Sequence, residues 1–529
     1  MKKFFALLIA LLMSSTTASA AEKILFIPHD NRPISSQQPA EVVEQLGYKV
    51  LMPPFEILNN PEQLWQWFNE NASKAKVAVV GSDALLYGGL IPSRSHKISA
   101  EELFNRVEAF KTLREKNPKL KIYAFGSLMR TPSFGTPGDI EEPDYYGQYG
   151  ADIFNYTALL DKREIDILSV KELNDLADLK KKIPAEILED WFARREKNLN
   201  ATKKLIDFTN EGIMDYFVIG RDDNAPLSQT HLEARQILNY MEENNVPKTK
   251  AQSHVGIDEY AMLLLTRAVN EIRGESPKVN AIFNQGVGED TIPDFSDERF
   301  GDSIRDEILI AGGVYTYKPE RADFVLLVNT DPNGETYSTH NSFPPQTLTD
   351  SQQKYFQDNA KNFVSLVESY VKKELPVGIA DTTFSNGSDV ALMEELHRRK
   401  LLFKLRSYSG WNTATNTSGF AIGSGILSKH MRSSSRKKIL TRRYLEDWGY
   451  QTFVRTKIAE ELSTRPDGLE IYLSLGEHET EITKQENKLI QDFAKKFLPR
   501  FGFMKNLHVS NPWHRMFECE IHFEKKKSS

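Results

Sequence analysis

Two adjacent carboxylates, Asp222 and Asp223, follow a short apolar segment in the middle of the chain. The segment Tyr216–Ile219 predicts a buried strand that Gly220 ends, and a helical pattern begins shortly after the acids. Polar groups at the carboxyl end of a parallel strand lie where α/β proteins bind ligands. Neighbouring aspartates repel each other, so at least one should have a raised pKa or face a cation. The pair indicates acid/base chemistry, with helix capping as the alternative.

A second acidic pair, Asp258 and Glu259, follows the strand-like segment Ala251–Val255 and precedes an apolar helical pattern. Capping of that helix explains one acid but not both, so catalysis is a hypothesis for this pair as well. His254, close by in the sequence, is either a ligand-binding residue or a hydrogen-bonded core residue. Asn224, directly after the first pair, can donate hydrogen bonds to a ligand.

Charged residues also follow strands near the N-terminus. Asp30 and Arg32 come after the first predicted strand, and Asp83 begins a loop whose glycines allow a backbone turn. These side chains either contact a ligand or form internal ion pairs that hold the strand ends together. Both interpretations stay open.

The segment SGWNTATNTSG at residues 409–419 has the composition of a sugar-binding surface. Trp411 would supply an apolar face, and Asn412 and Asn416 would supply amides for the hydroxyl groups of a sugar. Asp381 is expected at the rim of the same site. The alternative is that Trp411 fills the core at the start of a helix.

Several familiar signatures are absent from the sequence, including GxSxG, HExxH, a P-loop and a strand-embedded GxGxxG. We therefore predict no cofactor, although a divalent cation held by carboxylates stays an option. Zinc is disfavoured because no two histidines have the spacing of a metal site on one helix. Cys519, the only cysteine, alternates with apolar residues as in a strand, which predicts a buried structural thiol.

Apolar runs that end in polar or glycine-rich segments alternate with amphipathic helical patterns through most of the chain. This alternation predicts a parallel β-sheet. Eight such strand ends suit a (β/α)8-barrel-like core with the polar motifs on one face. Two doubly wound α/β domains are the alternative, because a further βα unit at 278–317 disturbs the strand count.

The predicted core spans residues 21–438 and includes a charged helical insertion at 148–200 and the βα insertion at 278–317. Whether 148–200 closes over the site stays open. Residues 439–529 form a C-terminal extension of helices and a final strand.

Residues 1–20 have the pattern of a signal peptide, with two lysines, an apolar stretch and the sequence Ala18-Ser19-Ala20. Cleavage after Ala20 would export the chain to the periplasm or the medium. No later segment is long and apolar enough to be a stable membrane anchor. The formal net charge of −6 gives no basic excess for nucleic acid. The expected partner is a small molecule or a glycan.

The chain resembles the bacterial family catalogued as domain of unknown function 4127, in motifs that follow one another along nearly all of the mature chain. The matching pieces are IPHDNRP, GSDALLYGGLIPSR, IPAEILEDWFARREKN, GRDDNAP, HVGIDEYAMLLLTRA, IADTTFSNGSD, YSGWNTATNTSG and PWHRMFE. The family usually has Leu-Asp where this chain has His29-Asp30, and Ala where it has Ile257. The acids are the same. The resemblance implies homology without an established activity.

An Asp-Asp pair after the fourth strand of a barrel is also similar to the arrangement in O-GlcNAcase-type hexosaminidases. That resemblance implies an exported glycoside hydrolase acting on an amino-sugar-containing glycan. Asp222 would orient or stabilise the substrate, Asp223 would be the acid/base, and Asp258 and Glu259 would be further carboxylates. A carboxylate-metal hydrolase using Mg²⁺ or Ca²⁺, and a non-catalytic carbohydrate-binding protein, are the alternatives.

Overall fold

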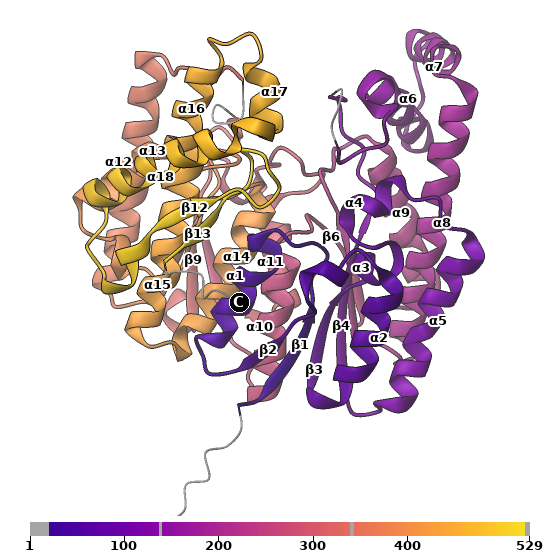
Figure 1. Ribbon diagram of the computed structural model, residues 1–529, viewed down its shortest axis with the longest axis horizontal. Coiled ribbons are helices and arrows are strands. Elements are labelled where there is room, and N and C mark those ends of the chain that lie inside the picture. Colours follow the sequence, from indigo (N-terminus) through magenta and orange to yellow (C-terminus); the bar gives the residue numbers. More distant parts are fainter. Residues whose placement is uncertain (1–20, 137–139, 339–342, 524–529) are drawn as a thin grey trace, which may run out of the picture.

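Six parallel strands from the N-terminal half of the chain form one sheet (Figure 1). The structure is a computed structural model that describes residues 21–136, 140–338 and 343–523, so the predicted signal peptide lies outside the described residues. The strands are rich in Val, Ile, Leu and Phe and are buried on both faces, as in sheets with helices on both sides. Their spatial order is β2 (Lys49–Leu51), β1 (Lys23–Ile27), β3 (Val77–Gly81), β4 (Lys121–Leu128), β5 (Tyr216–Arg221) and β6 (Ala251–Val255).

Five further parallel strands form a second sheet. Their spatial order is β11 (Tyr408–Ser409), β10 (Val377–Asp381), β9 (Phe324–Asn329), β7 (Lys278–Phe283) and β8 (Val314–Tyr315). In both sheets the first strand in sequence lies between the second and the third. This is the strand order of a flavodoxin-like doubly wound sheet, and it places a topological switch point beside β1 and another beside β7.

The strands do not close into the single barrel that the sequence predicts, because they are divided between two open sheets. This division is compatible with the alternative of two doubly wound units. The physical reason lies in α10 (Tyr260–Arg273), which is buried along most of its length. A helix that is apolar nearly all round must be covered on every side. It lies between the sheets with α11 (Phe300–Ile310) and α14 (Ala414–Leu427), so β6 and β7 are kept apart (Figure 1). Residues 278–317 are accordingly the start of the second sheet rather than an insertion.

The remaining helices of the N-terminal half cover the first sheet or extend from it. They are α1 (Gln37–Glu44), α2 (Pro61–Asn71), α3 (Ser82–Tyr87), α4 (Leu90–Ser95), α5 (Ala100–Lys116), α6 (Tyr146–Ile165), α7 (Val170–Lys182), α8 (Ala185–Asn210) and α9 (Gln229–Glu243). The predicted helical insertion corresponds to α6, α7 and most of α8. Its helices pack around Trp191 in a small apolar cluster of their own, and the later part of α8 returns to the first sheet.

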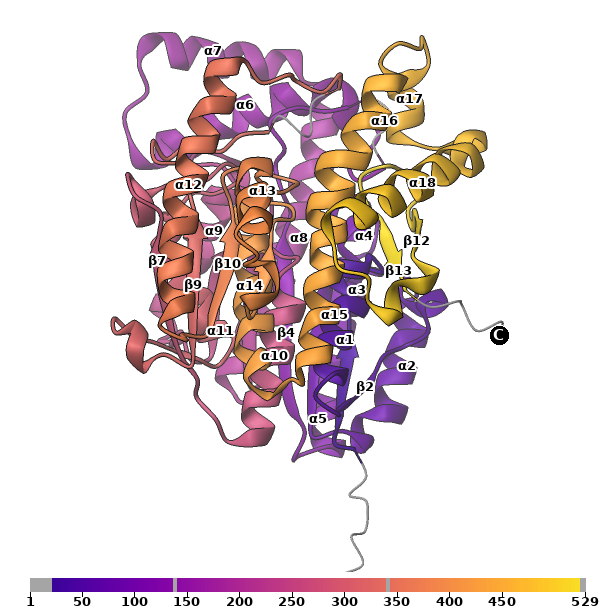
Figure 2. The same cartoon turned by 90° about the vertical axis from the view of Figure 1, so that its left-hand side faces the viewer.

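The second sheet is covered on its outer face by two helices and the C-terminal tail (Figure 2). These elements are α12 (Asp350–Lys372), α13 (Val390–Arg398), α15 (Ser433–Arg443), a π-helix (Tyr444–Val454), α16 (Arg455–Leu462), α17 (Gly468–Leu473), α18 (Glu479–Phe497) and the antiparallel strands β12 (His508–Ser510) and β13 (Glu520–His522). Cys519 is buried in this layer, as predicted. Within the described ranges, no helix has the length and apolarity needed to cross a membrane.

Candidate functional site

A cluster of buried ions lies at the carboxyl ends of β1 and β6. Arg32 Nη2 lies 2.7 Å from Asp30 Oδ2 and 2.5 Å from Asp258 Oδ1. His29 Nε2 lies 3.2 Å and 3.3 Å from the same two oxygens. We call these four residues the β1 cluster. It adjoins the switch point between β1 and β3, which is the position where doubly wound sheets bind ligands.

Burial and mutual attraction compete in the β1 cluster. Burial opposes the charge of His29, but Asp30 and Asp258 raise the pKa of its imidazole to about 9. Burial also opposes the charge of Asp30, but Arg32 and His29 hold the pKa of that carboxyl well below its usual range. The pKa of Asp258 is lowered against burial, chiefly by Arg32. Two cations and two anions thus hold one another in their charged forms.

The paired aspartates that follow β5 each bind a different arginine. Arg94 Nη2 of α4 lies 2.6 Å from Asp222 Oδ2, and Arg130 Nη1, in the loop after β4, lies 2.8 Å from Asp223 Oδ2. Arg130 also binds Glu142 at 2.5 Å. The predicted repulsion between the two aspartates is therefore relieved by two separate cations.

Asp223 differs from Asp222 in exposure and backbone. Its side chain is 27 % exposed, against 14 % for Asp222. Its φ of 42° is in the left-handed region, which Asp and Asn tolerate better than most residues. Partial enclosure and the charge of Asp222 raise the pKa of Asp223 to about 7, against the pull of Arg130. A carboxyl with that pKa can give or take a proton near neutrality.

Asp83 lies in the first turn of α3, directly after β3, where the sequence predicts a loop. Its carboxylate accepts hydrogen bonds from Ser127 N (3.1 Å) and Ser127 Oγ (2.8 Å), which ties β3 to β4. Burial raises the pKa of Asp83 to about 6, even though Ser127 stabilises the charged form. Because it is buried, Asp83 supports the strand ends rather than facing solvent.

Two parts of the chain that are distant in sequence complete the site. Asn412, from the loop after β11, donates a hydrogen bond of 3.3 Å to Asp258 Oδ2, so the second sheet reaches the first. Trp513 Nε1, between β12 and β13, donates to Asn31 Oδ1 at 2.7 Å, and its ring centroid lies 5.2 Å from the Arg32 guanidinium carbon. Sequence reasoning missed Trp513, although it belongs to the motif PWHRMFE.

The C-terminal tail also reaches the aspartate pair through Arg515, which sequence reasoning did not single out. Arg515 Nη1 lies 2.7 Å from Glu141 Oε1, and Glu141 Oε2 lies 3.2 Å from Arg94 Nη1 and 3.1 Å from Arg130 Nη2. Three arginines thus surround one loop carboxylate. Nothing in the local pattern of the tail indicates this contact, because it joins residues more than 370 positions apart.

Trp411 and Asp381 are placed differently from the sequence prediction. Trp411 is only 3 % exposed and packs near Phe517, so it is core and offers no face to a sugar. Asp381 is fully buried and accepts hydrogen bonds from Asn329 and Tyr408 of the second sheet at 3.0 and 2.8 Å. Both side chains are therefore buried, although the motifs around them are rich in polar residues.

Two of the predicted amides are likewise buried. Asn224 donates to Asp297 Oδ2 at 2.6 Å and accepts from Ser228 Oγ at 3.1 Å, so its amide supports the loop before α9. Asn416 is buried within the first turn of α14. The Oδ1 atom of Asn416 has no hydrogen-bond partner among the described residues. Of the amides in SGWNTATNTSG, Asn412 joins the site.

The second acidic pair is divided between two environments. Asp258 belongs to the β1 cluster, but Glu259 turns away from it toward His254 and Glu307. Side-chain donor atoms of His254, Glu259 and Glu307 lie within 4.8 Å of one another, as do those of His29, Asp30 and Asp258. In the β1 cluster the Arg32 guanidinium already supplies the positive charge between the acids, so a metal ion does not fit there.

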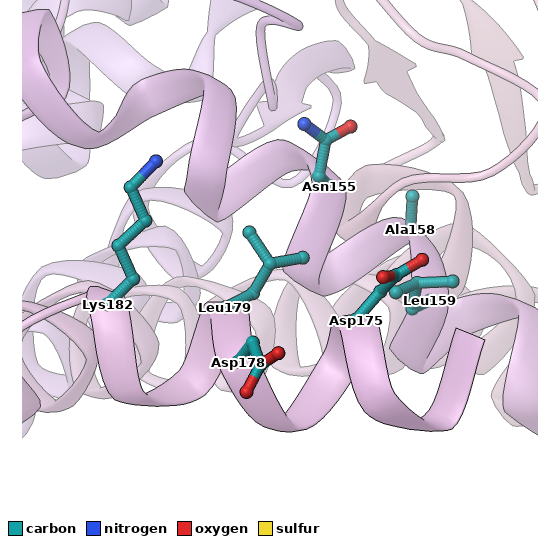
Figure 3. A pocket seen from close by; sticks show the side chains of 7 residues that line it. All are labelled: Asn155, Ala158, Leu159, Asp175, Asp178, Leu179 and Lys182. Carbon is teal, nitrogen blue, oxygen red and sulfur yellow. The ribbon is translucent and has the colours of Figure 1, made fainter. Parts of the chain in front are cut away.

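A surface hollow lies between α6 and α7 (Figure 3). Its charged residues form ordinary surface pairs, such as Lys182 with Asp152 at 2.8 Å and Asp175 with Lys171 at 2.7 Å. Exposed pairs of this kind contribute little free energy and carry no catalytic arrangement. The hollow is therefore not the candidate site.

Comparison with known proteins identifies the family of this chain but assigns it no activity. The model of a family described as "Protein of unknown function (DUF4127)" matches residues 24–522. No curated protein matches, and no solved structure matches.

Proposed function

This chain belongs to the DUF4127 family, and we propose that it is an exported glycoside hydrolase acting on a glycan that contains an amino sugar. The single observation that carries the proposal is the asymmetry of the aspartate pair at the end of β5. Asp223 is the more exposed acid and has a pKa of about 7, whereas Asp222 is held by Arg94 at 2.6 Å. Paired carboxylates in unlike environments are the usual arrangement for acid/base work on a glycosidic bond.

Asp223 would act on the glycosidic oxygen. Protonation of that oxygen turns the departing sugar into a neutral alcohol, and the resulting carboxylate can then remove a proton from the attacking water. Asp222, which is paired with Arg94, would orient the substrate or stabilise positive charge at the anomeric carbon. The positive φ at Asp223 turns it out of the strand direction, so neighbouring side chains in the sequence serve different purposes.

Sugar contacts would come from residues at the edge of the site. Trp513 is partly exposed and lies beside Arg32, so its ring can cover an apolar sugar face in place of the buried Trp411. Asn412 carries an amide close to Asp258. The pattern at residues 1–20 supports export, which would bring the protein to cell-wall or extracellular glycans.

Release of chromophore from a panel of aryl glycosides, including N-acetylhexosaminides, tests the proposal. We expect turnover by the mature chain and a loss of about 10²–10⁴-fold in Asp223→Asn, the range for a general acid/base. Asparagine tolerates the left-handed backbone, so this substitution removes the acid without straining the loop. The matched control is Asp175→Asn in the α7 hollow, which should keep full activity.

Full turnover by Asp223→Asn would refute the catalytic assignment. If the wild type turns over no glycoside of the panel but binds the oligosaccharides tightly, the site is a non-catalytic carbohydrate-binding site. If activity disappears after dialysis against chelator and returns with Mg²⁺ or Ca²⁺, the carboxylate-metal alternative replaces the proposal.

A further inference from the structure

Three buried side chains with unpaired polar atoms meet in the layer between the two sheets. His254 comes from β6, Glu259 from the start of α10, and Glu307 from α11. All three side chains are fully buried. His254 Nε2 lies 3.9 Å from Glu259 Oε1 and 3.8 Å from Glu307 Oε1, which is too far for a hydrogen bond.

The unpaired atoms are the unusual feature of this cluster. Both ring nitrogens of His254, both carboxylate oxygens of Glu259 and Oε2 of Glu307 lack a hydrogen-bond partner among the residues that the structure describes. Buried polar groups are nearly always paired, because an unpaired one costs the free energy of its desolvation. His254 Nε2 and the carboxylates of Glu259 and Glu307 face one another and can share one partner, whereas His254 Nδ1 faces Glu298.

We propose that His254, Glu259 and Glu307 bind one divalent cation of the first transition row, such as Zn²⁺ or Mn²⁺. Ligands of such ions lie about 2.0–2.2 Å from the metal, so two ligands of one ion are at most about 4.4 Å apart. The separations of 3.8 and 3.9 Å fall inside that limit. A neutral imidazole with two carboxylates suits these metals better than Ca²⁺ or Mg²⁺, which prefer oxygen alone.

Glu298 and Ser418 lie next to the three proposed ligands, in positions that orienting residues take around metal ions. Glu298 Oε1 lies 3.6 Å from His254 Nδ1, on the opposite side of the ring from the two ligand acids. A carboxylate in that position fixes the orientation and tautomer of a metal-binding histidine. Ser418 of α14 donates a hydrogen bond of 2.7 Å to Glu307 Oε1, which orients the second acid.

The proposed ion is structural rather than catalytic. Catalytic ions keep a coordination position open to substrate, whereas this cluster has no exposed side-chain surface. Free oxygens of Glu259 and Glu307 can complete four-coordination without water. The ion would join β6 of the first sheet to α10 and α11, the helices between the sheets. It lies apart from the β1 cluster and does not depend on the proposed function.

Protonation of the cluster is the alternative to a bound metal ion. Burial, and the charge of Glu307, raise the pKa of Glu259 well above its usual range, while burial raises the pKa of Glu307 to about 7. Without a metal ion, protons on Glu259 and on His254 would supply the compensating positive charge, because Glu298 and Glu307 raise the pKa of His254 to about 10 against burial. A divalent cation replaces those protons and neutralises both carboxylates at once.

Metal content of the full mature chain, purified without an affinity tag and measured by plasma mass spectrometry, tests the proposal. We expect about one transition-metal ion per chain. Glu259→Gln and Glu307→Gln should each reduce the content at least fivefold and lower the unfolding temperature. The matched control is Glu486→Gln. Glu486 is also buried, has a pKa raised by burial to about 7 and has an unpaired Oε2, but among the residues that the structure describes no histidine or second ligand acid completes a site around it.

Several results would overturn the proposal. One is a wild-type chain that carries no stoichiometric metal, even after unfolding in chelator and refolding with ZnCl₂ or MnCl₂. Another is undiminished metal in both glutamine variants, or loss of the metal in Asp30→Asn instead, which would place the ion in the β1 cluster. If the variants do not fold, anomalous diffraction from wild-type crystals decides, because the peak must lie between His254, Glu259 and Glu307.

Discussion

Asp222 and Asp223 are adjacent in sequence but lie in different environments. Both are aspartates at the end of β5, and each faces an arginine. The positive φ of Asp223 directs its side chain to a more exposed position, where burial and the charge of Asp222 raise its pKa to about 7. The backbone conformation at Asp223 thus accompanies a difference in exposure between two adjacent acids.

The pH dependence of turnover follows from this pKa. A general acid is active while protonated, so kcat/KM should fall as the pH rises above about 7. Arg130→Met removes a cation that lowers the pKa of Asp223, so the fall should move to higher pH by on the order of one unit. Arg114→Met is the control, because Arg114 binds Asp215, which precedes β5, and it should leave the profile in place. An unchanged alkaline fall in Asp223→Asn would contradict the assignment.

One buried arginine, Arg443, links the start of the C-terminal tail to α1 and, through Asp447, to the end of β11. Arg443, at the end of α15, binds Asp447 in a tight pair and donates to Gln38 of α1 at 2.5 Å. Asp447 also accepts from the backbone N–H of Gly410, beside β11, at 2.8 Å. The tail thus has a defined position against α1 and the second sheet before Trp513 returns to the site.

Arg443→Met should destabilise the protein by about 3–5 kcal/mol, because it leaves a buried carboxylate without its cation. Denaturant unfolding followed by circular dichroism measures the free energy of unfolding. Arg465→Met, the control, removes an exposed pair with Asp467 and should leave the free energy of unfolding nearly unchanged. Equal losses in the two variants would show that the buried pair has no special role.

At the scale of the whole molecule, the two sheets are held together by helices that pack closely between them. A Cβ at Gly423 of α14 would lie 2.7 Å from Met262 Cγ and 3.2 Å from Met262 O of α10. The glycine therefore lets α14 approach α10. Because α10 packs on the first sheet and α14 on the second, this contact sets how close the sheets can be.

Gly423→Val should destabilise the protein by about 1–3 kcal/mol through overpacking, since Met262 is fully buried and cannot move freely. The control is Gly502→Val, where a Cβ would meet no atom within 4 Å. Its effect should stay within about 0.5 kcal/mol. Thermal unfolding of both variants measures the difference, and a neutral Gly423→Val would mean that the interface between the sheets is loosely packed.

Local patterns in the sequence were enough to find many strands and some of the site. Apolar runs such as Tyr216–Ile219 and Ala251–Val255 form strands, and the acids that follow them lie at the strand ends, because short-range periodicity is set by the residues themselves. The choice between a barrel and two sheets could not be made this way. It depends on where α10 is buried, and an apolar helix can pack in either architecture.

The sequence alone determined the α/β class, the family and the positions of Asp30, Arg32, Asp222, Asp223 and Asp258 at strand ends. Tertiary structure decided which side chains meet. It buried Trp411, brought Trp513 to Arg32, and separated Asp258 from its neighbour Glu259. It also gathered His254, Glu259 and Glu307 from three elements. The physical reason is that burial and long-range pairing depend on packing between distant segments, which no local spacing encodes.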